Sequence, residues 1–315
     1  MTRRTLQIIR WGVFTLAVAF LCARVLGDGA EGPLRSGWSS IELLSGPVLA
    51  GVSLLMLCNW GLEARKWQAL MGPIQRLPFG RAFWATLAGT SIGLITPNRV
   101  GEFVGRVLFL DPEHRVEGSF ASLLGSIAQF VVTLLIGGLA LPFGQDLIGD
   151  AGSGWAWRIV ASSAFLIGCA AVLLYFSPKA FGRLMAGLPL LRRYERHARV
   201  LDTFDRSLLM RVFAISAVRY AVFTLQFAWL LHAVAEVDFV HALLAVPVVF
   251  LITTLVPTTV LTELGVRGSV AVFVVKGDPV PVAFCSALIW IINIVAPALA
   301  GAVALLLARI RTRVA

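Results

Sequence analysis

The chain has 315 residues, of which 58% are hydrophobic and only 14% are charged, and its formal net charge at pH 7 is +10. This composition lies outside the usual range of soluble globular proteins and is typical of an all-α polytopic membrane protein. It excludes a nucleic-acid-binding module, because no stretch is long and polar enough to form a basic soluble domain.

Six segments are long and apolar enough to cross a bilayer core, which needs about 20 helical residues. We expect these spans at residues 7–26, 44–62, 119–142, 157–177, 209–232 and 281–308. The basic start followed by an apolar run would also suit a signal peptide, but no clear small-x-small cleavage site follows. We therefore interpret residues 7–26 as an uncleaved first helix.

Basic residues are distributed unevenly between the predicted loops. Most of the 27 lie in the N-terminal segment, in residues 65–115, in residues 179–211 and near the C-terminus. Residues 143–156 and 233–240 carry acids but no Arg or Lys. Under the positive-inside rule this pattern places both termini in the cytoplasm of a bacterial-type inner (cytoplasmic) membrane.

Two further apolar segments, 81–97 and 241–257, each have 17 residues and end in proline, and they align without a gap. The identical pairs are Ala82 and Ala242, Ala85 and Ala245, Ile92 and Ile252, and Pro97 and Pro257. Each is followed by a glutamate and, four residues later, an arginine. We interpret the single membrane domain, 1–315, as an internal repeat of halves 1–150 and 151–315; chance resemblance of two membrane segments is the alternative.

The number of spans between the two charged segments predicts an inverted-topology repeat. Three full spans separate them, so they approach from opposite sides of the membrane if neither segment crosses it. Pro97 removes a backbone donor, and Gly101 weakens the helix that follows. We expect two re-entrant hairpins with tips at Pro97 and Gly101 and at Pro257 and Gly265, buried in protein or lining a wet cavity.

The hairpins carry the candidate binding residues. Glu102 and Arg106 are four residues apart and share a helical face with Arg99, and Glu263 and Arg267 repeat that spacing. Each charge costs about 2.5–3.5 kcal/mol at mid-membrane, so pairing is expected. The first segment keeps one arginine in excess, which an anion such as phosphate suits. The alternative is a pair of interfacial salt bridges that only anchor the hairpins.

Other polar residues have weaker interpretations. Arg219, within the fifth span, would face the cavity or contact a nearby interface, and both alternatives stay open. Asn59 and Gln129 are expected to form interhelical hydrogen bonds. The four cysteines lack metal-like spacing, and no cofactor or metal site is predicted, with Asp202 and Asp205 the only weak candidates for metal ligands.

The segment "PNRVGEFVGRVLFL" resembles the Pro-x-Arg-x-Gly-Glu-x-x-Arg signature of a flippase-like membrane domain family. That family is named after lysylphosphatidylglycerol synthase and includes the N-terminal part of the multiple peptide resistance factor. The matching positions are Pro97, Arg99, Gly101 and Glu102, whereas Arg106 falls one residue late. "VPTTVLTELGVRGSVAVF" is similar to the family's Gly-x-Gly-x-Arg-Glu element at Gly265 and Arg267. It departs at Glu263 and Gly268.

The resemblance implies a lipid-translocating fold whose two hairpins form a polar cavity. The expected function is that of a flippase, not an enzyme, with a phospholipid, glycolipid or polyprenyl-phosphate carrier as substrate. No Gly-x4-Gly-Lys-Ser/Thr motif occurs, so transport is expected to be passive or coupled to a proton or ion gradient. Homo-oligomer formation stays open. The alternatives are a membrane-embedded enzyme of lipid or glycan assembly, with Glu102 as general base, or an accessory subunit of one.

Overall fold

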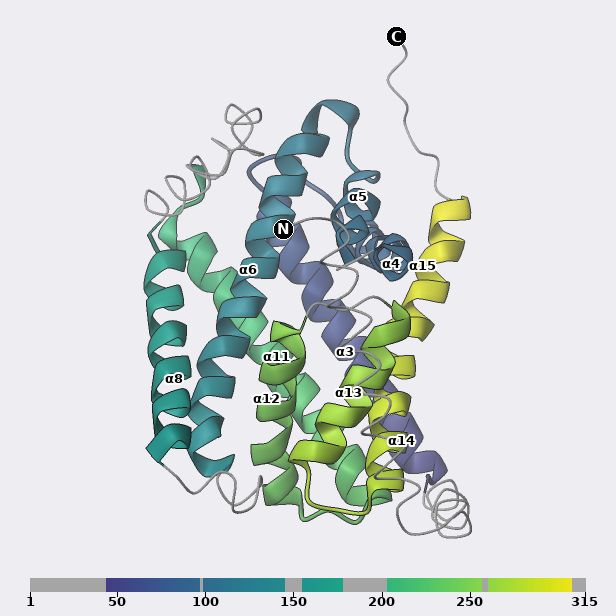
Figure 1. The fold of residues 1–315 in the computed structure, drawn as a ribbon. Coiled ribbons are helices and arrows are strands. Elements are labelled where there is room, and N and C mark those ends of the chain that lie inside the picture. Colours follow the sequence, from purple (N-terminus) through teal and green to yellow (C-terminus); the bar gives the residue numbers. More distant parts are fainter. Residues whose placement is uncertain (1–43, 97–98, 145–154, 178–202, 257–259, 308–315) are drawn as a thin grey trace, which may run out of the picture. The chain divides into compact units, whose positions relative to one another are not determined.

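The computed structural model describes residues 44–96, 99–144, 155–177, 203–256 and 260–307. Over these ranges every regular element is a helix and no strand occurs (Figure 1). The all-α prediction is confirmed for this part of the chain.

Five helical segments among the described residues are long and apolar enough to cross a membrane. They are α3 (Gly46–Met71), Pro112–Ala140, which joins the 3-10 turn η2 (Pro112–His114) to α6 (Arg115–Ala140), Arg158–Tyr175 within α8 (Trp155–Tyr175), α11 (Arg206–Val234) and Pro279–Leu307. Each corresponds to one of the predicted spans, whereas the span expected at 7–26 lies outside the described residues. Their length and composition indicate an integral membrane protein.

The second predicted span is longer than expected. The sequence predicts this span at residues 44–62 and predicts that the basic segment from residue 65 onward is cytoplasmic. In the structure α3 continues to Met71. Glu63 and Lys66 therefore belong to this helix, and both side chains are buried in the protein. The helix continues because good helix formers follow the apolar run and the charges find partners in neighbouring helices.

The described residues form two compact units. Unit 1 comprises the described parts of residues 1–56, 136–163 and 222–295, and unit 2 those of residues 57–135, 164–221 and 296–315. Each unit draws on both predicted sequence halves, and each contains one of the two charged segments. The internal repeat itself stays a prediction.

In unit 2 the first charged segment forms two helices that pack against each other. α4 (Phe79–Ile95) is followed by the short α5 (Gly101–Val107), which lies beside it (Figure 1). Gly93 contacts Glu102, and Gly89 contacts Arg106, so residue numbers rise along one helix as they fall along the other. α5 therefore runs antiparallel to α4. Its seven residues span only about 10 Å at 1.5 Å per residue.

The second charged segment, in unit 1, has a similar local structure. α12 (Phe239–Leu255) has 17 residues, as α4 does, and α13 (Val260–Val274) follows it. Thr96 and Val256, which end α4 and α12, both have extended backbone conformations. Each directly precedes a proline in the sequence, and proline disfavours the helical conformation of the residue before it. Both helices therefore end where the sequence predicts a break.

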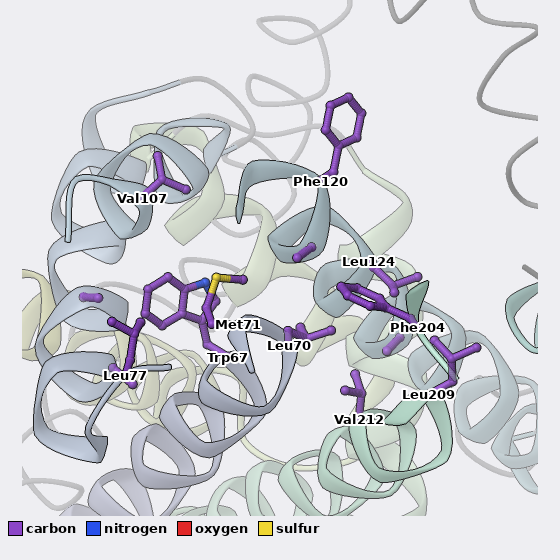
Figure 2. Close-up of a cluster of buried hydrophobic side chains, with 14 of the residues drawn as sticks. Trp67, Leu70, Met71, Leu77, Val107, Phe120, Leu124, Phe204, Leu209 and Val212 are labelled. Atoms are coloured by element: carbon purple, nitrogen blue, oxygen red, sulfur yellow. The ribbon is translucent and has the colours of Figure 1, made fainter. Parts of the chain in front are cut away.

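A hydrophobic core in unit 2 packs against the charged segment. Figure 2 shows Trp67, Leu70 and Met71 of α3 together in this cluster, with Leu209 and Val212 of α11 nearby. The Trp67 indole nitrogen donates a hydrogen bond of 2.9 Å to the Ser122 hydroxyl of α6, so its polar atom is satisfied in the core. This packing fixes the C-terminal half of α3, which carries Glu63 and Lys66.

α4 is also held by the last helix, α15 (Ala296–Leu307), in the same unit. Gly301 lies against the backbone of Leu87, and the hydroxyl of Ser91 donates a hydrogen bond to the carbonyl oxygen of Ala298. A β-carbon at residue 301 would overlap the Leu87 carbonyl group. The close contact therefore depends on glycine at this position.

The predicted last span combines α14 (Pro279–Trp290), the π-helical turn η7 (Ile291–Val295) and α15. Pro297 follows the π turn and has no N–H to donate to the carbonyl group of Asn293. The proline ring also clashes with that carbonyl group, and the helix is widened at Ile291–Val295, shortly before the proline.

Candidate functional site

A cluster of buried charged side chains lies in unit 2 around the carboxylate of Glu63, on α3. Oε1 of Glu63 is 2.6 Å from Nη1 of Arg106, and Oε2 is 2.7 Å from Nζ of Lys66. Oε2 also forms an ion pair with Nη1 of Arg219. Three cations, from α3, α5 and α11, thus converge on one carboxylate.

All four side chains are removed from solvent. The exposed fractions are 3% for Glu63, 2% for Lys66, 5% for Arg106 and 8% for Arg219. Removing one partner from a buried ion pair typically costs about 3–5 kcal/mol, because the other charge is left uncompensated. A single carboxylate carries one negative charge, so the field of three cations at Glu63 favours anions.

α5 contributes a second carboxylate at the edge of this cluster. Oε2 of Glu102 lies 3.3 Å from Nη2 of Arg106, which confirms the pairing expected from their four-residue spacing. Oε1 of Glu102 lies 3.8 Å from Nη1 of Arg99. The Glu102 and Arg99 side chains are 20% and 31% exposed, so this edge is the more accessible side of the cluster.

Two glycines of α4 make room for the charged side chains of α5. A β-carbon at Gly89 would stand 2.7 Å from Cγ of Arg106, and one at Gly93 would overlap Cγ of Glu102. The two glycines are four residues apart, as are Glu102 and Arg106. Because the two spacings are equal, the aliphatic parts of both charged side chains lie directly on the backbone of α4. This contact holds both side chains in one orientation.

The turn between α4 and α5 has an unusual backbone. Arg99 has a φ of 55°, in the left-handed region that residues other than glycine rarely adopt. The hydroxyl of Thr96 accepts a hydrogen bond of 2.8 Å from the Gly101 amide, which satisfies the first backbone donor of α5. A β-carbon at Gly101 would stand 2.6 Å from the Ile92 carbonyl oxygen, so glycine is required there. Pro97, the other expected tip residue, lies outside the described residues.

Arg219 belongs to the buried cluster in the interior of unit 2, and its facing a transport cavity stays a prediction. Its Nε donates hydrogen bonds to Oδ1 of Asn59 at 2.7 Å and to the Asn59 carbonyl oxygen at 3.3 Å. Its Nη1 donates to Oε1 of Gln129 at 3.2 Å. Asn59 and Gln129 thus form the expected interhelical hydrogen bonds, and both orient the guanidinium group toward Glu63.

The second charged pair lies in unit 1. Nε of Arg267 is 2.9 Å from Oε1 of Glu263, as the four-residue spacing predicts. The Arg267 side chain is 29% exposed and the Glu263 side chain 9%. Gly265 lies inside α13, which begins at Val260, so the tip predicted at Gly265 is wrong: the helix has already resumed before it. Pro257 lies outside the described residues.

Glu63 and Lys66 were not predicted as site residues from the sequence. They lie four and seven residues after Asn59, and this spacing puts all three on one face of α3. The signal that would have found them is the apolar pattern that continues past them through Trp67, Leu70 and Met71 to the end of the helix. A polar face embedded in such a pattern indicates buried partners.

The described residues contain no group of three or more His, Cys, Asp or Glu side chains that would hold a metal ion. Asp205, one of the two weak candidates, accepts a hydrogen bond of 2.9 Å from the Leu208 amide and caps the start of α11. Asp202 lies outside the described residues.

Comparison of the chain with known proteins found no matching family model, no matching curated protein and no matching solved structure.

Proposed function

We propose that this protein is a lipid flippase that moves an anionic or zwitterionic headgroup between the leaflets of a membrane. The single observation that carries the proposal is the convergence of Lys66, Arg106 and Arg219 on the buried carboxylate of Glu63. Charges in a membrane-embedded protein are costly and usually mark a substrate or ion pathway. A cation-rich cluster suits the phosphate group of a phospholipid or polyprenyl-phosphate headgroup.

The helix pair α4–α5 supports a re-entrant arrangement. α5 is much too short to cross a bilayer, and it runs back along α4. In the proposed arrangement the turn between α4 and α5 lies within the membrane, where the Thr96 hydroxyl satisfies the Gly101 amide. The charged residues then face a path for the headgroup, while the acyl chains stay in lipid.

The partly exposed pair Arg99–Glu102 is the proposed first contact for a headgroup. Its side chains are the most accessible charges of the cluster, and Glu102 also forms an ion pair with the buried Arg106. In unit 1, Arg267 is proposed to contact a headgroup as well, oriented by Glu263. Transport is proposed to be passive or coupled to a proton or ion gradient, because the sequence has no phosphate-binding ATPase loop.

A headgroup-movement assay tests the proposal. The full chain is reconstituted into vesicles that contain a fluorescent phosphatidylglycerol, and a reductant added outside quenches only the label in the outer leaflet. The protein should let the reductant quench more than the outer half. Arg106→Gln and Glu102→Gln should abolish this extra quenching while the protein remains folded in detergent.

Two matched substitutions serve as controls. Arg65→Gln removes an exposed arginine of α3, and Glu117→Gln removes a half-exposed carboxylate of α6. Both change the net charge as the site variants do but lie outside the cluster, so they should retain lipid movement. Normal movement in both Arg106→Gln and Glu102→Gln would reject the proposed site.

A further inference from the structure

The contacts of Glu63 resemble those of a bound phosphate group. Its two oxygens divide the cations between them: Oε1 pairs with Arg106, and Oε2 pairs with Lys66 and Arg219. A phosphodiester has one negative charge and two non-bridging oxygens, so it presents the same charge and a similar pair of acceptors. Two guanidinium groups and an ammonium group around such a pair of oxygens are typical of phosphate recognition.

The cluster also has donor capacity that Glu63 does not use. Nε of Arg106 is buried and has no hydrogen-bond partner among the described residues, and the same holds for Nδ2 of Asn59. Buried donors are normally satisfied, and leaving one unpaired costs about 1–3 kcal/mol. A phosphate group, whose ester oxygens add acceptors to the two non-bridging oxygens, would satisfy more of these donors.

We propose that Glu63 is an internal competitor, which occupies an anion site built from Lys66, Arg106 and Arg219, and that a phosphate group takes its place during transport. This inference rests on the proposed function and names the chemical class that its site binds. The ligand chemistry is a phosphate monoanion, supplied by a lipid headgroup or by free phosphate.

Exchange of one anion for another has an energetic advantage in a buried site. When the phosphate group enters, the cations pass from one negative charge to another, and the displaced Glu63 carboxylate takes up a proton from water, so that neither side is left with an uncompensated charge in a medium of low polarity. When it leaves, Glu63 pairs with them again. The competitor also weakens net binding, which a transport site needs because a tightly held headgroup would not be released.

The proposal predicts a combination of effects that a purely structural salt bridge would not produce. Glu63→Gln keeps the shape of the side chain but removes the competing charge. The affinity for a phosphate-bearing ligand should rise by at least about tenfold, whereas lipid movement should slow because the headgroup is released less readily. A structural role for Glu63 predicts lower stability and no gain in affinity.

The experiment is an equilibrium titration of the full chain, purified in a maltoside detergent that contains no phosphate. The three ligands are short-chain phosphatidylglycerol, inorganic phosphate and a diacylglycerol with the same acyl chains. Glu63→Gln should gain about tenfold for phosphatidylglycerol over the unaltered protein, with no gain for the diacylglycerol. Glu117→Gln, which also removes one negative charge, should show no gain for any ligand.

A gain confined to inorganic phosphate supports the internal competitor and identifies free phosphate, not the lipid, as the source of the ligand. Unchanged affinity of folded Glu63→Gln for both phosphate ligands overturns the proposal. If Glu63→Gln does not fold, the test compares Lys66→Gln with the double variant that carries both Lys66→Gln and Glu63→Gln. In the double variant only two buried cations, instead of three, lack the Glu63 carboxylate. The double variant should bind about tenfold more tightly than Lys66→Gln, and equal affinities overturn the proposal.

The outcomes also separate this inference from the proposed function. A gain in affinity for Glu63→Gln, together with no lipid movement by the unaltered protein, would retain the anion site and reject the flippase. Loss of movement in Arg106→Gln, together with unchanged affinity in Glu63→Gln, would retain the flippase and reject the internal competitor.

Discussion

Gly105 of α5 lies so close to Gly89 of α4 that a β-carbon at residue 105 would stand 2.6 Å from the α-carbon of residue 89. It would also stand 2.7 Å from the carbonyl oxygen of Ala88. Both neighbours are backbone atoms, so no side-chain rotation can relieve the overlap. The two helices therefore approach at this point only because both residues are glycine.

The substitution Gly105→Ala should force α5 away from α4. Overpacking of this kind costs about 1–3 kcal/mol, and the helix-forming gain of alanine over glycine, about 1 kcal/mol, offsets only part of it. The shift would also move the neighbouring Arg106 from Glu63, so lipid movement should fall with stability. Thermal unfolding in detergent and the headgroup-movement assay measure the two effects.

Gly61→Ala is the matched control for this prediction. Gly61 lies in α3, two residues before Glu63, and a β-carbon there would meet nothing within 4 Å. This variant should be as stable as the unaltered protein or more stable, by up to about 1 kcal/mol. Equal unfolding midpoints for Gly105→Ala and Gly61→Ala would contradict the close helix contact.

The helices that cross the membrane could be predicted because a long apolar run is a local signal. The span at 209–232 lies within α11, the span at 119–142 runs only two residues past the end of α6, and the helix breaks before Pro97 and Pro257 follow from the backbone of proline. The Glu102–Arg106 pair was also predictable, because four-residue spacing places both side chains on one helical face.

The centre of the cluster could not be predicted in the same way. The apolar pattern that continues past Glu63 and Lys66 indicates that both side chains are buried, but it does not indicate which residues they contact. Their burial depends on Arg106, 43 residues away from Glu63, and on Arg219 in α11. Such pairs carry no local pattern, since nothing in the sequence near Glu63 indicates which distant cation faces it.

Asn59→Ala should destabilise unit 2, because it removes the Oδ1 acceptor of the buried Arg219 Nε. Loss of a hydrogen bond to a buried charged group costs about 1.5–3 kcal/mol. Asn59→Asp should retain most of the stability, because it keeps an acceptor and adds negative charge beside the cations. The Nδ2 that it replaces donates to no described residue. Equal unfolding midpoints for Asn59→Ala and the unaltered protein would contradict this role of Asn59.

We expect Asp205 to make an acid-sensitive contribution to the free energy of unfolding. The hydrogen bond from the Leu208 amide, with a second from the Ser207 hydroxyl, lowers the pKa of the Asp205 carboxyl below its ordinary value. A carboxyl with a lowered folded-state pKa stabilises the fold above its unfolded-state pKa, about 3.9, and the contribution is lost as the pH falls through the folded-state pKa.

The variant Asp205→Asn retains a good N-cap side chain but cannot titrate. Its unfolding midpoint, measured from about pH 7 to about pH 3, should fall less steeply at the acid end than that of the unaltered protein. The two proteins should differ little near neutral pH. Identical acid profiles would show that titration of the Asp205 carboxyl does not contribute to the acid sensitivity of the fold.

Arg267→Gln should separate lipid movement from stability more clearly than Arg106→Gln does. The Arg267 side chain is 29% exposed, and a partly exposed ion pair contributes about 1 kcal/mol or less, so the unfolding midpoint should change little. Lipid movement should fall by about tenfold if the guanidinium contacts the headgroup, because one charge-assisted hydrogen bond is lost. Lys276→Gln, which removes an exposed cation of the same unit, should leave both quantities unchanged. If Arg267→Gln moves lipid as fast as Lys276→Gln, the Glu263–Arg267 pair only stabilises α13, and headgroup contact is confined to the cluster around Glu63.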